Sequence, residues 1–295
     1  MIKSPINWIE AARPKTLPAA VAPVVLGSCI CVSVGKFQPI PALLCLLVAI
    51  TLQIACNFSN DYSDGIRGTD NERVGPKRLV ASGTVSAKTM LKASLGTYSL
   101  SCIFGLILVI YTQKWWLILL GLLCIVAAWY YTGGKYPYGY RGYGEISVFV
   151  FFGLIATIGT TYLQTNTIPP VSISTAFSIG MLSTAMLMIN NIRDIESDRK
   201  AGKHTLATKL GVGKSKALYT VLIILPLVIG ITTFVYAKLA ILTGVTGFLV
   251  LKILKIVLYT DDPKKLILAL KYTGQLEILY ALILGTAIAL KPITG

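Results

Sequence analysis

Two short polar segments interrupt a chain that is otherwise strongly apolar. The first runs from Asn60 to Asp70 and the second from Asn190 to Arg199. Aligned without gaps, both begin Asn-(Asp/Asn)-x-x-Asp. Of the 12 acidic residues in the chain, four lie in 61–72 and three in 194–198. More than half of the negative charge is therefore concentrated in two matched segments.

Side chains of each segment can share one helix face. Positions i, i+4 and i+8 drift by only about 80° around a helix, so Asn190, Asp194 and Asp198 form one set and Asn60 and Asp64 another. Carboxylates gathered in this way repel one another, and each costs about 2.5–3.5 kcal/mol at membrane depth. Oxygen ligands of this kind suit Mg²⁺, which one or two carboxylates hold together with substrate phosphates. The pattern indicates a diphosphate held by metal ions between the two segments.

Cationic and aromatic side chains accompany these segments. Arg67 lies within the first segment, Lys77 follows it and Lys203 follows the second, while the stretch 129–143 combines six tyrosines with Lys135 and Arg141. Cations of this kind can hold a leaving diphosphate, and tyrosine ring faces can stabilise a carbocation. Two alternatives stay open. The tyrosines can form an ordinary interfacial belt, and a single Asp can be a helix cap or an ion-pair partner.

Long apolar helices must position these groups. The chain has 295 residues, is 55% hydrophobic and has a mean hydropathy of +0.72, whereas soluble domains are about 45–50% apolar. A membrane span needs about 20 apolar residues. This predicts an all-α polytopic membrane protein whose nine spans, the last being the shortest, lie at 16–35, 39–59, 91–111, 115–132, 145–163, 171–191, 217–236, 239–258 and 276–290.

The distribution of basic residues predicts the orientation of the spans. Of the 27 Lys and Arg residues, 23 fall before the first span, in the loops on that same side or in the span ends next to those loops, and the other four are Lys36, Lys114, Lys238 and Lys291. Cationic loops stay on the cytoplasmic side, so the N-terminus and both polar segments are expected in the cytoplasm, on a cell inner membrane. The net charge of +15 then faces anionic lipid, and no nucleic-acid partner is expected.

The polar segments also define an internal repeat. In each case a span ends in an acidic cluster, a basic loop follows, and another span begins, in loops at about 60–90 and 190–216. Repeat-built membrane proteins place their sites where the repeats meet. We therefore expect one domain, 1–295, with a single site between the two segments.

The motifs resemble those of the UbiA superfamily of intramembrane prenyltransferases along nearly the whole chain. That family usually carries Asn-Asp-x-x-Asp-x-x-x-Asp first, whereas here Gly68 replaces the final Asp, with Asp70 two residues later, and Asn190 stands where many members have Asp. The ligands of each metal among Asn60, Asp61 and Asp70, and between Asn190 and Asn191, therefore stay open. Together with the opening Arg13-Pro14-Lys15-Thr16-Leu17-Pro18, both motifs resemble those of 1,4-dihydroxy-2-naphthoate prenyltransferases.

This resemblance implies a reaction and its residues. A polyprenyl group would pass from an allylic diphosphate to 1,4-dihydroxy-2-naphthoate with loss of CO₂, giving demethylmenaquinol inside the bilayer and without an obligatory protein partner. The implied catalytic residues are Asp64, Asp194, Lys135 and Tyr131. The implied Mg²⁺ ligands are Asn60, Asp61, Asp64, Asn191, Asp194 and Asp198. The diphosphate would be bound by Arg67, Lys77, Lys135, Arg141 and Lys203, and the acceptor carboxylate by Arg13 or Lys15.

Other functions remain as alternatives. The acceptor can instead be that of phylloquinone-type phytylation, 4-hydroxybenzoate or homogentisate. A CDP-alcohol phosphotransferase would need an Asp-Gly-x-x-Ala-Arg signature, which the sequence after Asp64 lacks. A cation transporter would more naturally carry its carboxylates in the middle of a span than beside cationic loops.

Overall fold

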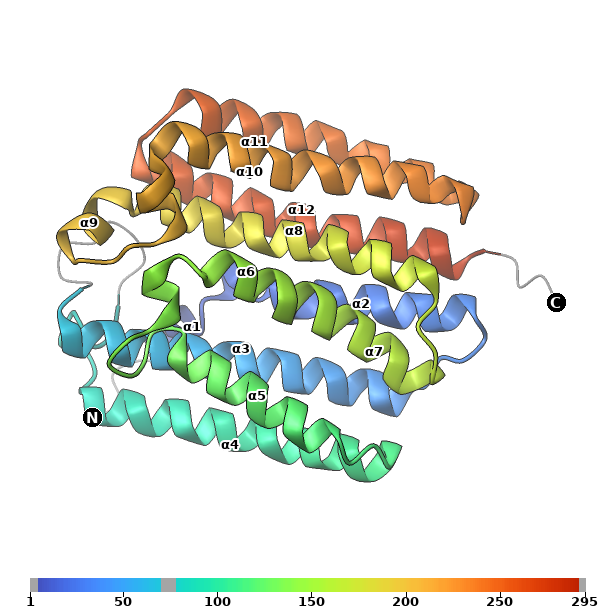
Figure 1. The fold of residues 1–295 in the computed structure, drawn as a ribbon, viewed down its shortest axis with the longest axis horizontal. Coiled ribbons are helices and arrows are strands. Elements are labelled where there is room, and N and C mark those ends of the chain that lie inside the picture. Colours follow the sequence, from blue (N-terminus) through green and yellow to red (C-terminus); the bar gives the residue numbers. More distant parts are fainter. Residues whose placement is uncertain (1–4, 70–77, 292–295) are drawn as a thin grey trace.

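The computed structural model describes residues 5–69 and 78–291, and within these ranges it contains helices and loops but no strand. Long helices lie side by side in one bundle (Figure 1). The helices are α1 (Pro5–Ala12), α2 (Pro18–Ser33), α3 (Pro39–Arg67), α4 (Ala87–Thr112), α5 (Leu117–Tyr130), α6 (Gly144–Val148), α7 (Ala156–Thr165), α8 (Pro170–Arg193), α9 (Ile195–Lys200), α10 (Leu206–Thr232), α11 (Gly247–Tyr259) and α12 (Pro263–Ala289).

Local sequence explains where the long helices begin and end. Proline occupies the start of α2, α3, α8 and α12, where its missing N–H costs nothing. The side chains of Ser86 and Thr205 accept hydrogen bonds from backbone N–H groups in the first turns of α4 and α10, as N-caps do. Gly68, with φ 71°, ends α3 in the left-handed conformation. This last turn releases the chain directly after the first polar motif.

Seven helices among the described residues are long and apolar enough to span a membrane, and an eighth span arises if Trp8–Thr16 and Pro18–Ser33, bent by 51°, are one unit. The remaining predicted span, 115–132, corresponds to α5, which has 14 residues and is about 21 Å long, shorter than a hydrocarbon core of about 30 Å. The sequence also predicts the last span at 276–290, whereas α12 begins at Pro263. Lys264, Lys265 and Lys271 depress the hydropathy of its first turns.

Tight packing concentrates on α8 and its neighbours. Buried residues run along most of α8, and one hydrophobic core joins it to α2, α10 and α12. Glycines allow the closest approach, since a Cβ on Gly153 would lie 2.5 Å from the Cα of Gly180. Without a hydrophobic force between helices in lipid, small residues let backbones pack closely. By contrast, α5 has no buried residue and lies at the periphery (Figure 1).

The bundle brings both polar motifs to one end. The C-terminal ends of α3 and α8 lie at the same end of the molecule, together with α1, α9 and the loop that precedes α6 (Figure 1). Because α3 and α8 each run toward that end, the acidic residues in their last turns share one side of the bilayer. The expectation that the two motifs belong to a single site is compatible with this topology.

Candidate active site

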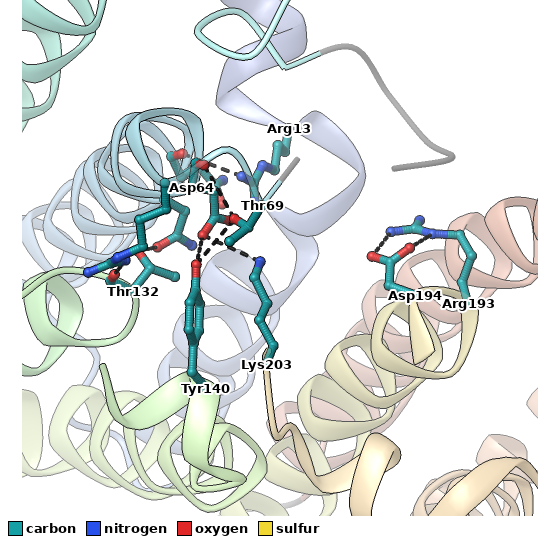
Figure 2. A network of polar contacts seen from close by, with 11 residues as sticks. Arg13, Asp64, Thr69, Thr132, Tyr140, Arg193, Asp194 and Lys203 are labelled. Carbon is teal, nitrogen blue, oxygen red and sulfur yellow. Dashed lines mark hydrogen bonds and ion pairs between the residues drawn. The ribbon is translucent and has the colours of Figure 1, made fainter. Parts of the chain in front are cut away.

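Asp64 lies at the centre of a polar network at this end of the bundle. Its Oδ1 accepts a hydrogen bond from the Tyr140 hydroxyl and lies 3.4 Å from the Lys203 ammonium nitrogen. The Thr69 hydroxyl is 3.4 Å from that of Tyr140. Asp64 comes from α3, Tyr140 from the tyrosine-rich loop and Lys203 from the loop after the second motif. Three segments distant in the sequence therefore converge on one carboxylate (Figure 2).

Backbone contacts hold the partners of Asp64 in place. The N–H of Lys203 donates to the carbonyl of Asp198 at 2.8 Å, and the N–H of His204 donates to the carbonyl of Tyr140 at 2.8 Å. The Lys203 ammonium also lies 4.6 Å from the centre of the Tyr140 ring. The second motif is thus linked, through Asp198 and Lys203, to the tyrosine-rich loop and to the first motif.

Tyrosines of the loop stay protonated next to these charges. Burial, and then the negative charge of Asp64, raise the pKa of Tyr140 well above its ordinary value. Burial also raises the pKa of Tyr131, with Glu145 as the next cause, and the pKa of Tyr138 to about 12. All three hydroxyls therefore remain hydrogen-bond donors throughout the physiological range.

Asp61 belongs to the same motif as Asp64, but its carboxylate contacts backbone amides. Its Oδ2 accepts from the N–H of Leu79 at 3.0 Å, and its Oδ1 accepts from the N–H of Val80 at 3.2 Å. Leu79 is fully buried, so Asp61 takes the place of water as the partner of its amide. Asp61 therefore ties the loop after the first motif to the end of α3.

The second motif makes a different set of contacts. Arg193 forms two hydrogen bonds of 2.7 Å with the carboxylate of Asp194, and this pair stands apart from Asp64 with Lys203 between them (Figure 2). The Nδ2 of Asn190 donates to the carbonyl of Met186 at 3.2 Å. The Nδ2 of Asn191 donates to Oε1 of Glu145 at 2.9 Å. Asp194 and Asp198 are both buried.

A cavity of about 560 Å³ opens directly beneath these motifs. Arg13, Asn60, Tyr131 and Asn190 line its motif end. Its wall follows α3 from Asn60 down to Cys45, a length of about 22 Å at 1.5 Å per residue. Apart from the motif end, aliphatic and aromatic side chains dominate the lining. The cavity therefore suits a molecule with a polar head and a long apolar tail.

Of the remaining predicted cations, Arg67 lies beside this network, with its guanidinium carbon 5.4 Å from the centre of the Tyr140 ring. Lys135 and Arg141 are exposed, and their charged groups lie 5.5 and 4.9 Å from the ring of Tyr136. Arg67 donates to the carbonyls of Thr132 and Gly134, which closes the glycine turn after α5. Lys15 is exposed beside the cavity-lining Arg13. Lys77 lies outside the described residues.

The sequence motifs assign no specific role to two residues of the site, Tyr140 and Glu145. Tyr140 is one of six tyrosines in its loop, and the sequence contains no signal that separates it from the others. Glu145 does carry a signal, because an acidic residue beside an apolar span is costly and therefore marks a function or a buried partner. A further contact joins the loop to the first motif, since the Thr132 hydroxyl donates to Oδ1 of Asn60 at 2.7 Å.

The donor chemistry fits a hard divalent cation. Asp64 in the last turns of α3, and Asn190, Asn191 and Asp194 at the end of α8, offer oxygen donors, and these two helix ends lie at one end of the bundle (Figure 1). Within residues 5–69 and 78–291, however, no three His, Cys, Asp or Glu side chains form a ready metal cluster. Mg²⁺ typically takes only one or two carboxylates, and substrate phosphates complete its coordination. The residues present therefore suit a metal that is held jointly with a phosphorylated ligand.

Comparison with known proteins identifies the family of this site. The model of the UbiA prenyltransferase family matches residues 20–289. The chain belongs to the UbiA prenyltransferase family. A 1,4-dihydroxy-2-naphthoate octaprenyltransferase from Mycobacterium tuberculosis is 42% identical, over 96% of this chain and 97% of the relative. One of the same name from Escherichia coli is 45% identical, over 69% of this chain and 68% of the relative.

Solved structures share the fold of this prenyltransferase. A UbiA homologue from Archaeoglobus fulgidus, bound to GPP and Mg²⁺, superposes with a TM-score of 0.68 over 94% of this chain and 99% of the homologue. The two sequences are 15% identical, so this likeness concerns the architecture. The family match, the all-helical bundle and the acidic motifs agree on a membrane prenyltransferase.

The contacts of Asp61 predict that it has a structural role distinct from that of Asp64. In Asp61→Asn, the amide NH₂ would face one of the two backbone N–H donors, and a buried donor without a partner costs about 1–3 kcal/mol. We expect faster hydrogen exchange of the peptide that contains Leu79 and Val80. Asp64→Asn is the matched control and should leave exchange there unchanged. Wild-type protection of that peptide in Asp61→Asn would contradict this role.

Proposed function

We propose that this enzyme transfers a polyprenyl group from an allylic diphosphate to 1,4-dihydroxy-2-naphthoate, giving demethylmenaquinol for menaquinone synthesis. One observation carries the proposal: Asn60 of the first motif and Asn190 of the second line the same end of one long apolar cavity, and Lys203 lies between Asp64 and Asp194 in Figure 2. The relatives named as naphthoate octaprenyltransferases support the choice of acceptor. A cation transporter would have no use for an apolar cavity of this length.

The apolar cavity is the site of the prenyl tail. A chain that enters from the motif end passes between α3, α5 and α8, among residues such as Leu52, Ile125 and Leu187. Burying each CH₂ of the tail contributes about 0.8 kcal/mol. The diphosphate then remains at the level of Asn60 and Asn190, where oxygen donors and Lys203 are available. Binding of the tail therefore places the allylic carbon at the mouth of the cavity.

The residues at the mouth hold and neutralise the diphosphate. Asp64, Asp194 and Asp198, with the amide oxygens of the two motifs, would hold Mg²⁺. The metal supplies Lewis-acid stabilisation of the leaving group. Lys203 can turn from Asp64 toward the diphosphate while remaining against the Tyr140 ring. Tyr140 keeps its proton and donates to Asp64, which fixes the orientation of that carboxylate.

The transfer itself balances without an added oxidant or reductant. The bond between the allylic carbon and the diphosphate oxygen breaks, and both electrons leave with the diphosphate. An electron pair of the naphthoate ring forms the new carbon–carbon bond at the carbon that bears the carboxylate. That carboxylate leaves as CO₂ and returns its bonding pair to the ring. Tyr131, which lines the cavity, offers its ring to the allylic cation.

Arg13 is the residue best placed for the acceptor. It lines the motif end of the cavity and lies where α1 meets the first transmembrane element, with its Nη2 3.5 Å from the carbonyl of Asn57. A guanidinium matches the geometry of a carboxylate. Lys15 stays exposed outside the cavity wall and is the weaker candidate. We assign the motif end to the cytoplasmic face of the inner membrane, in agreement with the basic loops that lie there.

The reaction can be tested with the whole protein in membranes. With Mg²⁺ and a polyprenyl diphosphate, we expect mass spectrometry to detect a prenylated, decarboxylated product from 1,4-dihydroxy-2-naphthoate and none from 4-hydroxybenzoate or homogentisate. EDTA should stop the reaction. Asp64→Asn and Asp194→Asn should each lower the rate on the order of 100-fold or more while inserting normally. Product only from another acceptor, or wild-type rates in both variants, would overturn the proposal.

The cavity predicts that donor length can be restricted from its wall. Ala49 lines the cavity about 16 Å below Asn60, so Ala49→Trp should obstruct long tails but spare short ones. Transfer from a long polyprenyl diphosphate should fall on the order of 10-fold or more, with transfer of a geranyl group nearly unchanged. Leu43→Trp, on the exposed side of the same helix, is the control. An equal loss with both donors would place the tail elsewhere.

A further inference from the structure

Glu145 is a buried carboxyl group that the motifs do not include. It lies in the first turn of α6, at the start of an apolar span over Gly144–Thr165, and is only 4% exposed. A carboxyl group in such a place is costly unless a partner compensates for it. Its position in the first turn of a short helix supplies part of that compensation, but does not account for its side-chain contact.

That contact is made to the second motif. Oε1 of Glu145 accepts from Nδ2 of Asn191 at 2.9 Å, while Oε2 is buried and has no hydrogen-bond partner among the described residues. A carboxylate can only accept hydrogen bonds, so it selects the NH₂ side of the amide. Because the amide is planar, its Oδ1 must then face away from Glu145. The orientation of Asn191 is therefore set by α6 rather than by α8 itself.

Close packing fixes Glu145 against this part of the site. A Cβ on the preceding Gly144 would lie 3.2 Å from both the Tyr131 hydroxyl and Cδ2 of Leu187. The absence of that Cβ lets the start of α6 press against α8 and against the tyrosine that lines the cavity. The Thr184 hydroxyl also lies 3.5 Å from the carbonyl of Glu145. The carboxyl group thus has a defined position relative to the last turns of α8.

The motif alignment explains why residue 191 is an asparagine. Residue 191 is equivalent to Asp61, whose two oxygens accept from backbone N–H groups. The neighbour of residue 191 is the carboxylate of Glu145, which accepts hydrogen bonds. Residue 191 must therefore be a donor, and a carboxylate at this position would be repelled by Glu145. Asn191 satisfies Glu145 and still retains a carbonyl oxygen. It also lies three residues before Asp194, which makes the two side chains neighbours on one helix surface.

We propose that Glu145 is a positioning residue for the second motif: through Asn191 it orients an amide oxygen, and with it the end of α8, toward the metal–diphosphate. The proposal rests on the function proposed above. Partners that orient a ligand typically contribute 10–100-fold, in order of magnitude, to metal affinity. Glu277 is the natural comparison, because it is also a buried acid with one orphaned oxygen, but its Oε1 accepts from Ser183 at 2.5 Å, away from the motifs.

Metal affinity measured without turnover tests this role. Mn²⁺ would be titrated into the purified full-length protein in the presence of an inert geranyl thiolodiphosphate, with free Mn²⁺ read by EPR. We expect Glu145→Leu to weaken Mn²⁺ binding by about 10–100-fold, and Glu145→Gln, which keeps an acceptor oxygen, to restore most of it. The matched control Glu277→Leu should bind Mn²⁺ as the wild type does.

Three outcomes would overturn the role of Glu145. They are wild-type Mn²⁺ affinity in a folded Glu145→Leu, an equal loss of affinity in Glu277→Leu, or wild-type affinity in Asn191→Leu. The Asn191→Leu variant leaves Glu145 unchanged, so it tests the role even if Glu145→Leu does not fold. The proposed function is judged separately by transfer to the naphthoate with the wild-type enzyme. If that transfer occurs and Mn²⁺ affinity is unaffected by these changes, only the role of Glu145 fails.

Discussion

Negative side chains at the ends of apolar helices need positively charged or hydrogen-bonding partners, and in this protein Asp64 of the first half of the bundle finds such a partner in the second half. The ion pair between Asp64 and Lys203, at 3.4 Å, joins α3 to the segment that follows the second motif. Buried pairs of this kind stabilise little by themselves, because desolvation offsets most of the attraction. Their value here is geometric. In the function proposed above, this pair would keep both motifs within reach of one ligand whose own charge is strongly negative.

The two halves use equivalent positions in different ways. In the first, Asp61 receives two backbone amides and secures the loop at Leu79 and Val80. In the second, Asn191 donates to Glu145. The second position of each motif, Asp61 or Asn191, therefore makes structural contacts. Asp64 and Asp194, three residues further on, carry charges that a metal can share. The two motifs share the order of their polar groups, but the equivalent groups meet different surroundings.

Much of this arrangement can be predicted from sequence, because helix formation and membrane insertion depend on local apolar content. The acidic motifs are also recognisable in the sequence, because charged residues are rare in so apolar a chain. The start of α12 cannot be predicted in this way, because Lys264 and its neighbours lower the hydropathy of a helix that extends beyond the apolar window. The family match confirms the resemblance that those motifs indicated.

Contacts across the bundle lie beyond sequence patterns. Nothing local distinguishes Tyr140, which meets Asp64, from Tyr136, which lies beside Lys135 and Arg141 at the surface. That difference arises from the path of the loop over the bundle. The same holds for Glu145, whose partner Asn191 lies 46 positions away. Sequence spacing gives the inventory of groups, and the packing of helices decides which of them meet.

The central claim is that both motifs hold one metal–diphosphate together. The most direct measurement is diphosphate-dependent Mn²⁺ binding, followed by EPR with an inert thiolodiphosphate, in the wild type, Asp64→Asn and Asp194→Asn. Joint binding predicts that either substitution alone removes most of the Mn²⁺ that appears only with the diphosphate analogue. Full diphosphate-dependent binding in one of the two variants would show that a single motif suffices, and would contradict the account.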